Sequence, residues 1–198
     1  MTKWDERYQT EEYIFGTQPN EFIARIRPYL PACGRALDLA TGEGRNGIFL
    51  ARHGLETEGV DMSEVGLAKA RKLAQQYHVP FTTRLADIAQ MPMPKQHYAV
   101  ISLVFCHFME PERTRIMQRI VNALQPGGLF AGVFYHPEQI RFGTGGPSNV
   151  EMLGTLPAMQ QALSGLDWLI AEHCQREMNE GNRHIGPSSV ICLLGRKP

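Results

Sequence analysis

The chain of 198 residues is long enough to bury the core of one domain, and residues 1–198 are expected to form a single domain. Because 20 lysines and arginines balance 20 aspartates and glutamates, no basic excess favours a nucleic acid or an anionic membrane as partner. No stretch approaches the roughly 20 apolar residues of a membrane span, and no secretion signal is evident, which predicts a cytoplasmic protein with reduced thiols. The cysteines and histidines lack metal-ligand spacing, so no metal is expected.

The first 18 residues alternate aromatic and polar side chains. The simplest interpretation is an arm whose rings, Trp4, Tyr8, Tyr13 and Phe15, pack on the domain. Apolar residues then recur at helical spacing at Phe22, Ile23, Ile26 and Leu30. This pattern predicts a helix that holds Pro19 in its first turn and ends at Pro28 and Pro31.

Residues 36–40 form an apolar run interrupted only by Asp38, which predicts a short buried strand. Gly42 and Gly44 allow a sharp turn before a helix that ends at Gly54. The first turn of such a helix offers unpaired N–H groups and a partial positive charge to a ligand. The turn also matches the G-x-G-x-x-G pattern of dinucleotide sites, but Asp38 would repel a pyrophosphate that crosses it.

Residues 57–61 predict a second strand, which ends in Asp61. A carboxylate there can accept hydrogen bonds from both hydroxyls of a ribose, while Met62 packs on an adenine. The alternative is a helix cap, although Ser63 is closer to the cap position of the helix that follows. After a third strand at residues 80–85, the Asp87 carboxylate and the main-chain N–H of Ile88 can read the adenine, unless Asp87 only opens a turn.

Residues 98–104 form the most apolar strand of the sequence, and Phe105 and His107 follow it. In an open parallel sheet, ligands bind beyond the carboxyl ends of the strands, which places both side chains near a ligand bound at that edge. His107 is therefore a candidate proton acceptor, with packing or capping as the alternative.

A helix from Pro111 and a strand at residues 129–135 come next, and His136 leaves that strand. Residues 141–147 combine Arg141 with three glycines, which predicts a substrate loop or lid, or else a solvated linker. A helix over residues 155–165 precedes two closing strands, residues 167–178 and 188–196. Residues 179–187 are expected to join them as a turn, in which His184 is a tip residue or a substrate contact.

Two of these runs resemble motifs of class I S-adenosylmethionine (SAM) dependent methyltransferases. The first is Leu37-Asp-Leu-Ala-Thr-Gly-Glu-Gly-Arg-Asn46, whose Gly-Arg-Asn ending is similar to the branch that contains the tellurite-resistance methyltransferase TehB. Ala40 and Thr41 stand where this motif usually has Gly-Cys, so the turn must tolerate a Cβ at position 40. The second is Leu124-Gln-Pro-Gly-Gly128, which resembles the Leu-x-Pro-Gly-Gly element of the family.

The resemblance implies an α/β three-layer sandwich with a seven-stranded, mostly parallel Rossmann-like sheet that has one antiparallel strand. It implies SAM as cofactor, covered by an N-terminal arm and helix at residues 1–31. The residues implied in cofactor binding are Asp38, Ala40, Gly42, Gly44, Arg45, Asn46, Asp61, Met62, Asp87 and Ile88. Those expected around the acceptor are Tyr13, Phe15, Phe105 and Arg141.

The implied reaction is in-line transfer of a methyl group to a small molecule by a monomer or homodimer. A thiol, a chalcogen oxyanion such as tellurite, or an amine needs only positioning, whereas a hydroxyl or carbon acceptor needs a base such as His107, His136 or His184. The alternatives are a non-catalytic SAM-binding regulatory protein and a nicotinamide-dependent oxidoreductase.

Overall fold

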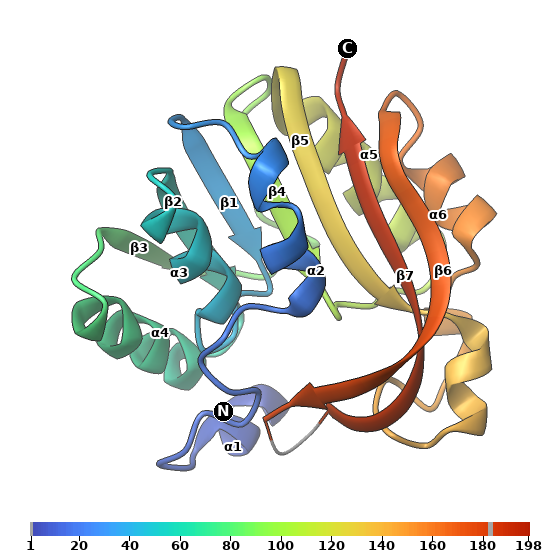
Figure 1. The fold of residues 1–198 in the computed structure, drawn as a ribbon, viewed down its shortest axis with the longest axis horizontal. Helices are drawn as coiled ribbons and strands as arrows, with labels where there is room; N and C mark the ends of the chain where they lie inside the picture. The colour runs from blue at the N-terminus through green and yellow to red at the C-terminus, as the bar shows by residue number, and fades with distance from the viewer. Residues whose placement is uncertain (1, 182–183) are drawn as a thin grey trace.

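The structure is a computed structural model that describes residues 2–181 and 184–198, and its seven strands form one sheet in the order β3-β2-β1-β4-β5-β7-β6 (Figure 1). The strands are β1 (Arg35–Leu39), β2 (Glu56–Asp61), β3 (Phe81–Leu85), β4 (Tyr98–Val104), β5 (Leu124–Tyr135), β6 (Asp167–Glu180) and β7 (His184–Arg196). The α-helices are α1 (Lys3–Tyr8), α2 (Glu21–Arg25), α3 (Arg45–Arg52), α4 (Glu64–Gln76), α5 (Glu112–Ala123) and α6 (Leu156–Ala162). Short 3₁₀ helices are η1 (Arg27–Tyr29), η2 (Pro137–Arg141) and η3 (Val150–Met152).

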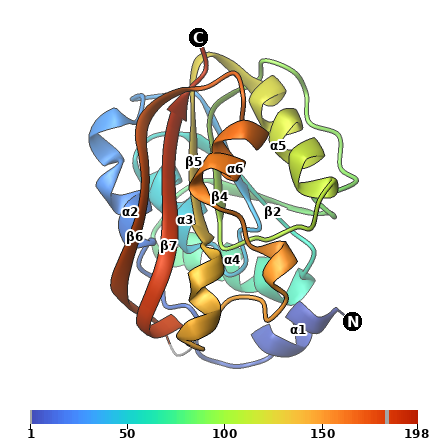
Figure 2. The same ribbon diagram turned by 90° about the vertical axis from the view of Figure 1, so that its right-hand side faces the viewer.

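Helices cover both faces of the sheet, which gives the expected three layers (Figure 2). On one face, the apolar residues of α2 pack with Leu50 of α3 against β1, β4, β5 and β7. On the other, the apolar stripes of α5 and α6 pack against Leu37, Leu39 and Phe130. The helical spacing of apolar residues that the sequence displays is therefore the spacing that buries each helix.

Strands β1 to β5 run parallel, and β7 runs antiparallel to both β5 and β6. This confirms a mostly parallel sheet with one antiparallel strand. The carboxyl ends of the parallel strands meet at one edge, where α1 and the bent end of the β6–β7 hairpin also lie (Figure 1). In open sheets of this kind, that edge is where ligands bind.

The closing hairpin is longer than the sequence predicts. Its strands pair as far as Glu180 with His184, so residues 179–187 are mostly strand rather than a loop, and residues 182 and 183 lie outside the described part of the chain. Apolar periodicity missed this extension because polar side chains occupy the face turned toward the N-terminal segment. Arg176 pairs there with Glu21, and Glu180 pairs with Arg45.

Two further boundaries differ from the prediction. The Asn20 side chain accepts the N–H of Phe22 at 3.0 Å and caps α2, so Pro19 precedes the helix and does not belong to its first turn. Pro28 lies in a 3₁₀ turn after α2, so the helix is one short segment. Strand β5 begins at Leu124, and its register against β4 shifts before Leu129.

Among the described residues, no helix is long and apolar enough to cross a bilayer.

Candidate functional site

The turn after β1 is held in a left-handed backbone conformation. Ala40 and Gly42 both have φ of 54°, and Gly44, which precedes α3, has φ of 91°. A Cβ built on Gly44 would lie 2.7 Å from the Cβ of Ala70 in α4, so the close packing of two helices requires glycine here. Ala40 does adopt the turn with its Cβ, as the departure from the usual Gly-Cys required.

Asp38 supports this turn from inside the protein. Its carboxylate is buried and accepts the hydroxyls of Thr41 and Ser102, each at 2.6 Å. Burial raises the pKa of Asp38, and these two hydrogen bonds oppose the rise. The structure therefore places Asp38 as the group that ties the glycine turn to β4, the neighbouring strand.

Asp61 joins the ends of two strands at the same edge. One carboxylate oxygen accepts the N–H of Gly42 at 2.8 Å, and the other accepts the N–H of Ser63 at 2.9 Å. Ser63 caps α4 through the N–H of Gly66, as its position predicted. Each carboxylate oxygen has a further lone pair, so Asp61 can hold the turn and still accept from a ligand hydroxyl.

An open surface follows Asp61 along the edge. The Met62 side chain is 47% exposed, and Asp87 is exposed after β3. The Asp87 side chain accepts the N–H of Ala89 at 2.9 Å, so it also opens a turn, while Ile88 is buried in the core. The chemistry of these groups fits an adenosine: the Asp61 carboxylate suits the ribose hydroxyls, the Met62 thioether suits the face of the adenine ring, and the Asp87 carboxylate suits the adenine amino group.

Helix α1 lies over the glycine turn. The Tyr8 ring is buried between Gly42 and Gly66, and its hydroxyl lies 2.5 Å from the position that a Cβ on Gly42 would take. Asp5 fastens the helix because it accepts the Ser63 hydroxyl at 2.6 Å. The arm thus covers the edge at which the acids converge.

Lys69 of α4 holds the segment that follows α1. Its ammonium group pairs with the buried Glu43 and donates to the carbonyls of Thr10 at 3.1 Å and Glu12 at 2.6 Å. The Tyr13 hydroxyl donates to the carbonyl of Lys69 at 3.1 Å. One side chain therefore joins the glycine turn, α4 and the arm.

Replacing Lys69 with methionine is expected to loosen the arm, because three of its attachments are lost while the apolar stem remains. Amide hydrogen exchange of the peptide over residues 2–15 should be faster in Lys69→Met than in the wild type. Lys72, which is exposed on the same helix, provides the matched control Lys72→Met. Equal exchange in all three proteins would contradict the role given to Lys69.

Arg45 and Asn46 also fasten this cover. Arg45 pairs with Glu180 of β6 at 2.6 Å and donates to the carbonyl of Phe15 at 3.2 Å, and Asn46 accepts the N–H of Asn20 at 2.8 Å. The structure thus directs both side chains toward the arm and the hairpin.

Aromatic rings gather beside the turn. The His184 ring centroid lies 4.6 Å from that of Phe15, 4.7 Å from Phe105 and 5.8 Å from Tyr135. Tyr13 lies elsewhere, packed on α4 against the Lys69 ammonium. The Tyr135 hydroxyl is buried and has no hydrogen-bond partner among the described residues, whereas the Nδ1 of His184 lies 3.7 Å from the Glu180 carboxylate.

The three candidate histidines have different surroundings. His107 accepts the N–H of Tyr135 through Nε2 at 3.1 Å, and burial lowers its pKa to about 4. His136 accepts the N–H of Glu138 and caps η2 at its N-terminus. His107 and His184 both lie against the aromatic group, with ring centroids 5.7 and 5.8 Å from that of Tyr135. The Nδ1 of His184 faces the Glu180 carboxylate at 3.7 Å.

The glycine-rich loop packs over these rings. A Cβ on Gly145 would lie 2.9 Å from the Tyr135 hydroxyl and 3.3 Å from Cδ2 of His184. The Thr144 hydroxyl donates to the carbonyl of Pro187 at 2.6 Å and fastens the loop to β7. Arg141 is exposed at the start of this loop.

Sequence reasoning did not assign four residues that build this region, Tyr8, Lys69, Tyr135 and Glu180. Tyr8 was noted only among the packing rings of the arm, and Tyr135 only as the end of a strand. An acid that alternates with Arg176 and Met178 was the one available signal for Glu180. No sequence signal pointed to Lys69, because a lysine on the polar face of a helix is common.

Residues 36–128 match a family described as "Methyltransferase domain". A carboxy-S-adenosyl-L-methionine synthase of Campylobacter curvus is 25% identical over 119 residues, which are 59% of this chain and 50% of that protein. The chain spans about half the length of the curated relatives it matches. These matches favour SAM over the dinucleotide that the glycine pattern alone allowed.

Solved structures agree with this fold. TehB from Haemophilus influenzae superimposes with a TM-score of 0.72 at 16% identity, over 98% of this chain and 66% of that one. A protein solved in work on the conversion of a disulfide bond into a thioacetal group during echinomycin biosynthesis gives 0.77 at 12% identity, over 98% and 90%. At these identities the likeness establishes the fold. Residues 36–128 thus match a methyltransferase domain family, in a chain whose fold is shared with solved methyltransferase structures.

Proposed function

We propose that this protein, whose residues 36–128 match a methyltransferase domain family, binds SAM and transfers its methyl group to a small-molecule acceptor. The observation that carries the proposal is the convergence of Asp61, the glycine turn and the rings of Phe105 and Tyr135 on the carboxyl edge of the sheet. This is the edge at which an open α/β sheet binds its ligands.

The chain's own residues fit the cofactor. Asp61 accepts from the ribose hydroxyls with the lone pairs that Gly42 and Ser63 leave free, and Met62 offers its exposed side chain to the adenine. Asp87 and the N–H of Ile88 read the adenine edge. The arm at residues 2–31 covers the turn through Tyr8.

The acceptor site lies among Phe15, Phe105, Tyr135 and His184, below the loop at residues 143–146. SAM supplies a methyl group that is already activated on a sulfonium. The protein's part is therefore to align the acceptor and exclude water. Alignment of two reactants can lower the activation free energy by roughly 7–11 kcal/mol. The rings and the docked loop form such a water-poor wall.

The surroundings of the histidines favour an acceptor that needs no base. His107, with its pKa of about 4 and its Nε2 already accepting a hydrogen bond, is neutral at physiological pH and has no free lone pair at that nitrogen. A thiolate, a chalcogen oxyanion or an amine free base attacks without help. The Tyr135 hydroxyl and His184 orient it, and exposed Arg141 attracts an anionic form before the loop closes.

Adding a methyl group at Gly145 is expected to displace the loop, because the new Cβ would contact the Tyr135 hydroxyl at 2.9 Å. Gly145→Ala should lower kcat/KM for the acceptor about 10-fold or more while leaving the SAM dissociation constant within about 2-fold, since poor alignment costs rate. Gly143→Ala is the matched control, because its φ is also positive but nothing lies within 4 Å of the new Cβ. Equal losses in both variants would assign the effect to backbone strain.

The proposal is tested by incubating the protein with SAM and a panel of thiols, amines, phenols, tellurite and selenite, and measuring S-adenosylhomocysteine. Release that depends on one acceptor class, and that Gly145→Ala lowers, supports methyl transfer. Tight binding of SAM with no release from any acceptor supports the alternative of SAM binding without methyl transfer. A specific observation favours that alternative, since two of the matched relatives are carboxy-S-adenosyl-L-methionine synthases.

A further inference from the structure

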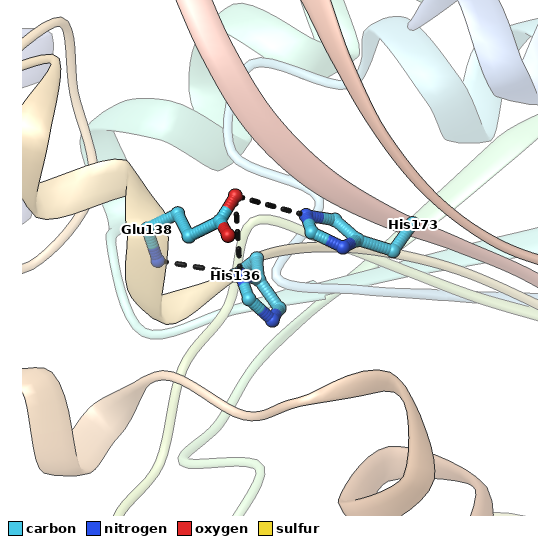
Figure 3. A group of neighbouring side chains, drawn as sticks. All are labelled: His136, Glu138 and His173. Atoms are coloured by element: carbon cyan, nitrogen blue, oxygen red, sulfur yellow. Dashed lines mark hydrogen bonds and ion pairs between the residues drawn. The ribbon is translucent and has the colours of Figure 1, made fainter.

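Two histidines and a glutamate meet on the face of the sheet opposite the aromatic rings. Figure 3 shows the Glu138 carboxylate facing the imidazoles of both His136 and His173. His136 and Glu138 come from the segment just after β5, and His173 comes from β6, where it pairs with Ile191. Two elements far apart in sequence thus place three metal-ligating side chains together.

The distances are close to those of a metal site. The Glu138 carboxylate oxygen lies 3.6 Å from Nε2 of His173 and 3.9 Å from Nδ1 of His136, and all three ligand atoms lie within 4.8 Å of one another. Ligands of tetrahedral zinc, at about 2.0–2.1 Å from the ion, are about 3.3 Å apart. The carboxylate contacts therefore need to shorten by only a few tenths of an ångström.

The two imidazoles must turn before they can share an ion. Their rings now stack at 3.8 Å with an angle of 24° between planes, so their in-plane lone pairs do not point at one position. The His173 side chain is 30% exposed, and its Nε2 would exchange the Ser189 hydroxyl for the ion. The Nδ1 of His136 would likewise exchange the N–H of Glu138, which it accepts at 3.3 Å, for the ion. The Gln175 amide donates at 3.3 Å to the same Glu138 oxygen that faces the two histidines, and this contact helps to orient the carboxylate.

We propose that His136, Glu138 and His173 bind a divalent transition-metal ion of the Zn²⁺ class, with solvent at the remaining positions. Two neutral imidazoles and one carboxylate suit such an ion, whereas Mg²⁺ and Ca²⁺ prefer oxygen ligands alone. The bound ion would fasten η2, and with it the start of the glycine-rich loop, to β6. Because 34 residues separate Glu138 from His173 and a strand ladder joins them, no sequence spacing indicated the site.

A second group offers a competing site and an internal comparison. Glu172, Cys174 and Cys192 also bring ligand atoms within 4.8 Å of one another on the other face of the hairpin. Glu172 pairs there with Arg25 of α2, and burial raises the pKa of the Cys192 thiol to about 12, which opposes the thiolate form that binds metals. The histidine group is the more accessible of the two.

The test is titration of the reduced protein with ZnCl₂ by calorimetry and with CoCl₂ by visible absorption, which reports the ligand geometry. The wild type should bind one equivalent of either ion, and His173→Gln and Glu138→Gln should each weaken binding at least 10-fold. Cys174→Ser and His78→Asn, which alter the competing group and an exposed histidine outside both groups, should bind as the wild type does.

Three results would overturn the proposal. The first is the absence of saturable binding by the wild type. The second is binding that survives both His173→Gln and Glu138→Gln, and the third is binding that Cys174→Ser abolishes. Far-UV circular dichroism of each variant separates lost ligands from lost folding, and because His173 and Glu138 lie at the surface, all variants are expected to fold.

Discussion

Replacing Glu180 with alanine is expected to lower the free energy of unfolding by about 3–5 kcal/mol, the usual cost of removing one partner of a buried ion pair. Glu180 and Arg45 are 11% and 9% exposed, and their charged atoms lie 2.6 Å apart. The substitution leaves the Arg45 guanidinium buried without its counter-charge. Urea denaturation of the wild type and the variant measures the difference.

The matched control is Glu177→Ala, because Glu177 is exposed on the other face of β6. It should change the free energy of unfolding by less than about 0.5 kcal/mol. A Glu180→Ala variant as stable as this control would show that the Arg45–Glu180 pair does not hold the hairpin to the turn.

The same pair predicts a pH dependence. Burial alone would raise the pKa of Glu180, but His184 and the Arg45 charge outweigh it and hold the pKa at about 2, below the ordinary value of 4.5. A carboxyl whose pKa is lower in the folded state stabilises the protein above its unfolded pKa and loses that contribution as the pH falls from about 4.5 to 2. The stability gap between wild type and Glu180→Ala should therefore narrow over this range.

Replacing Asp61 with alanine is expected to weaken S-adenosylhomocysteine binding by roughly 1–3 kcal/mol, or about 5- to 150-fold. The ribose hydroxyls lose their acceptor, and the N–H of Gly42 loses the carboxylate that holds the turn. Calorimetric titration of the wild type, Asp61→Ala and Asp61→Asn measures the change. The asparagine variant keeps one acceptor oxygen, so its affinity should fall between the other two.

An unchanged dissociation constant in Asp61→Ala would mean that Asp61 only shapes the turn. Thermal melting of the free variants distinguishes the two contributions, because loss of the Gly42 and Ser63 hydrogen bonds lowers stability even without a ligand.

The central sheet could be predicted because its signals are local. Buried parallel strands are continuous apolar runs, as in residues 98–104, and Gly44 stands where two helices approach too closely for a side chain. Asp61 could be located because the carboxyl end of the second strand lies beside the first turn in a doubly wound sheet of this kind. Its hydrogen bond to Gly42 agrees with that placement.

The cover of the site could not be predicted because its contacts join distant parts of the chain through polar groups. Arg45 meets Glu180 across 135 residues, and Lys69 meets the carbonyls of residues 10 and 12. Main-chain carbonyls carry no sequence signal, and a charged side chain gives no sign of its partner. The length of the β6–β7 hairpin could not be predicted for the same reason, because its inner face is polar where it meets Glu21 and Arg45.

The account's central claim, that the edge formed by the glycine turn and Asp61 binds SAM, is tested most directly by adding S-adenosylhomocysteine or NADH to the wild-type protein and measuring the melting temperature. At 100 times the dissociation constant, S-adenosylhomocysteine should raise it by about 5–10 °C, and NADH should leave it unchanged. A protein whose melting temperature responds to neither SAM nor S-adenosylhomocysteine, or that responds to NADH instead, would contradict the account.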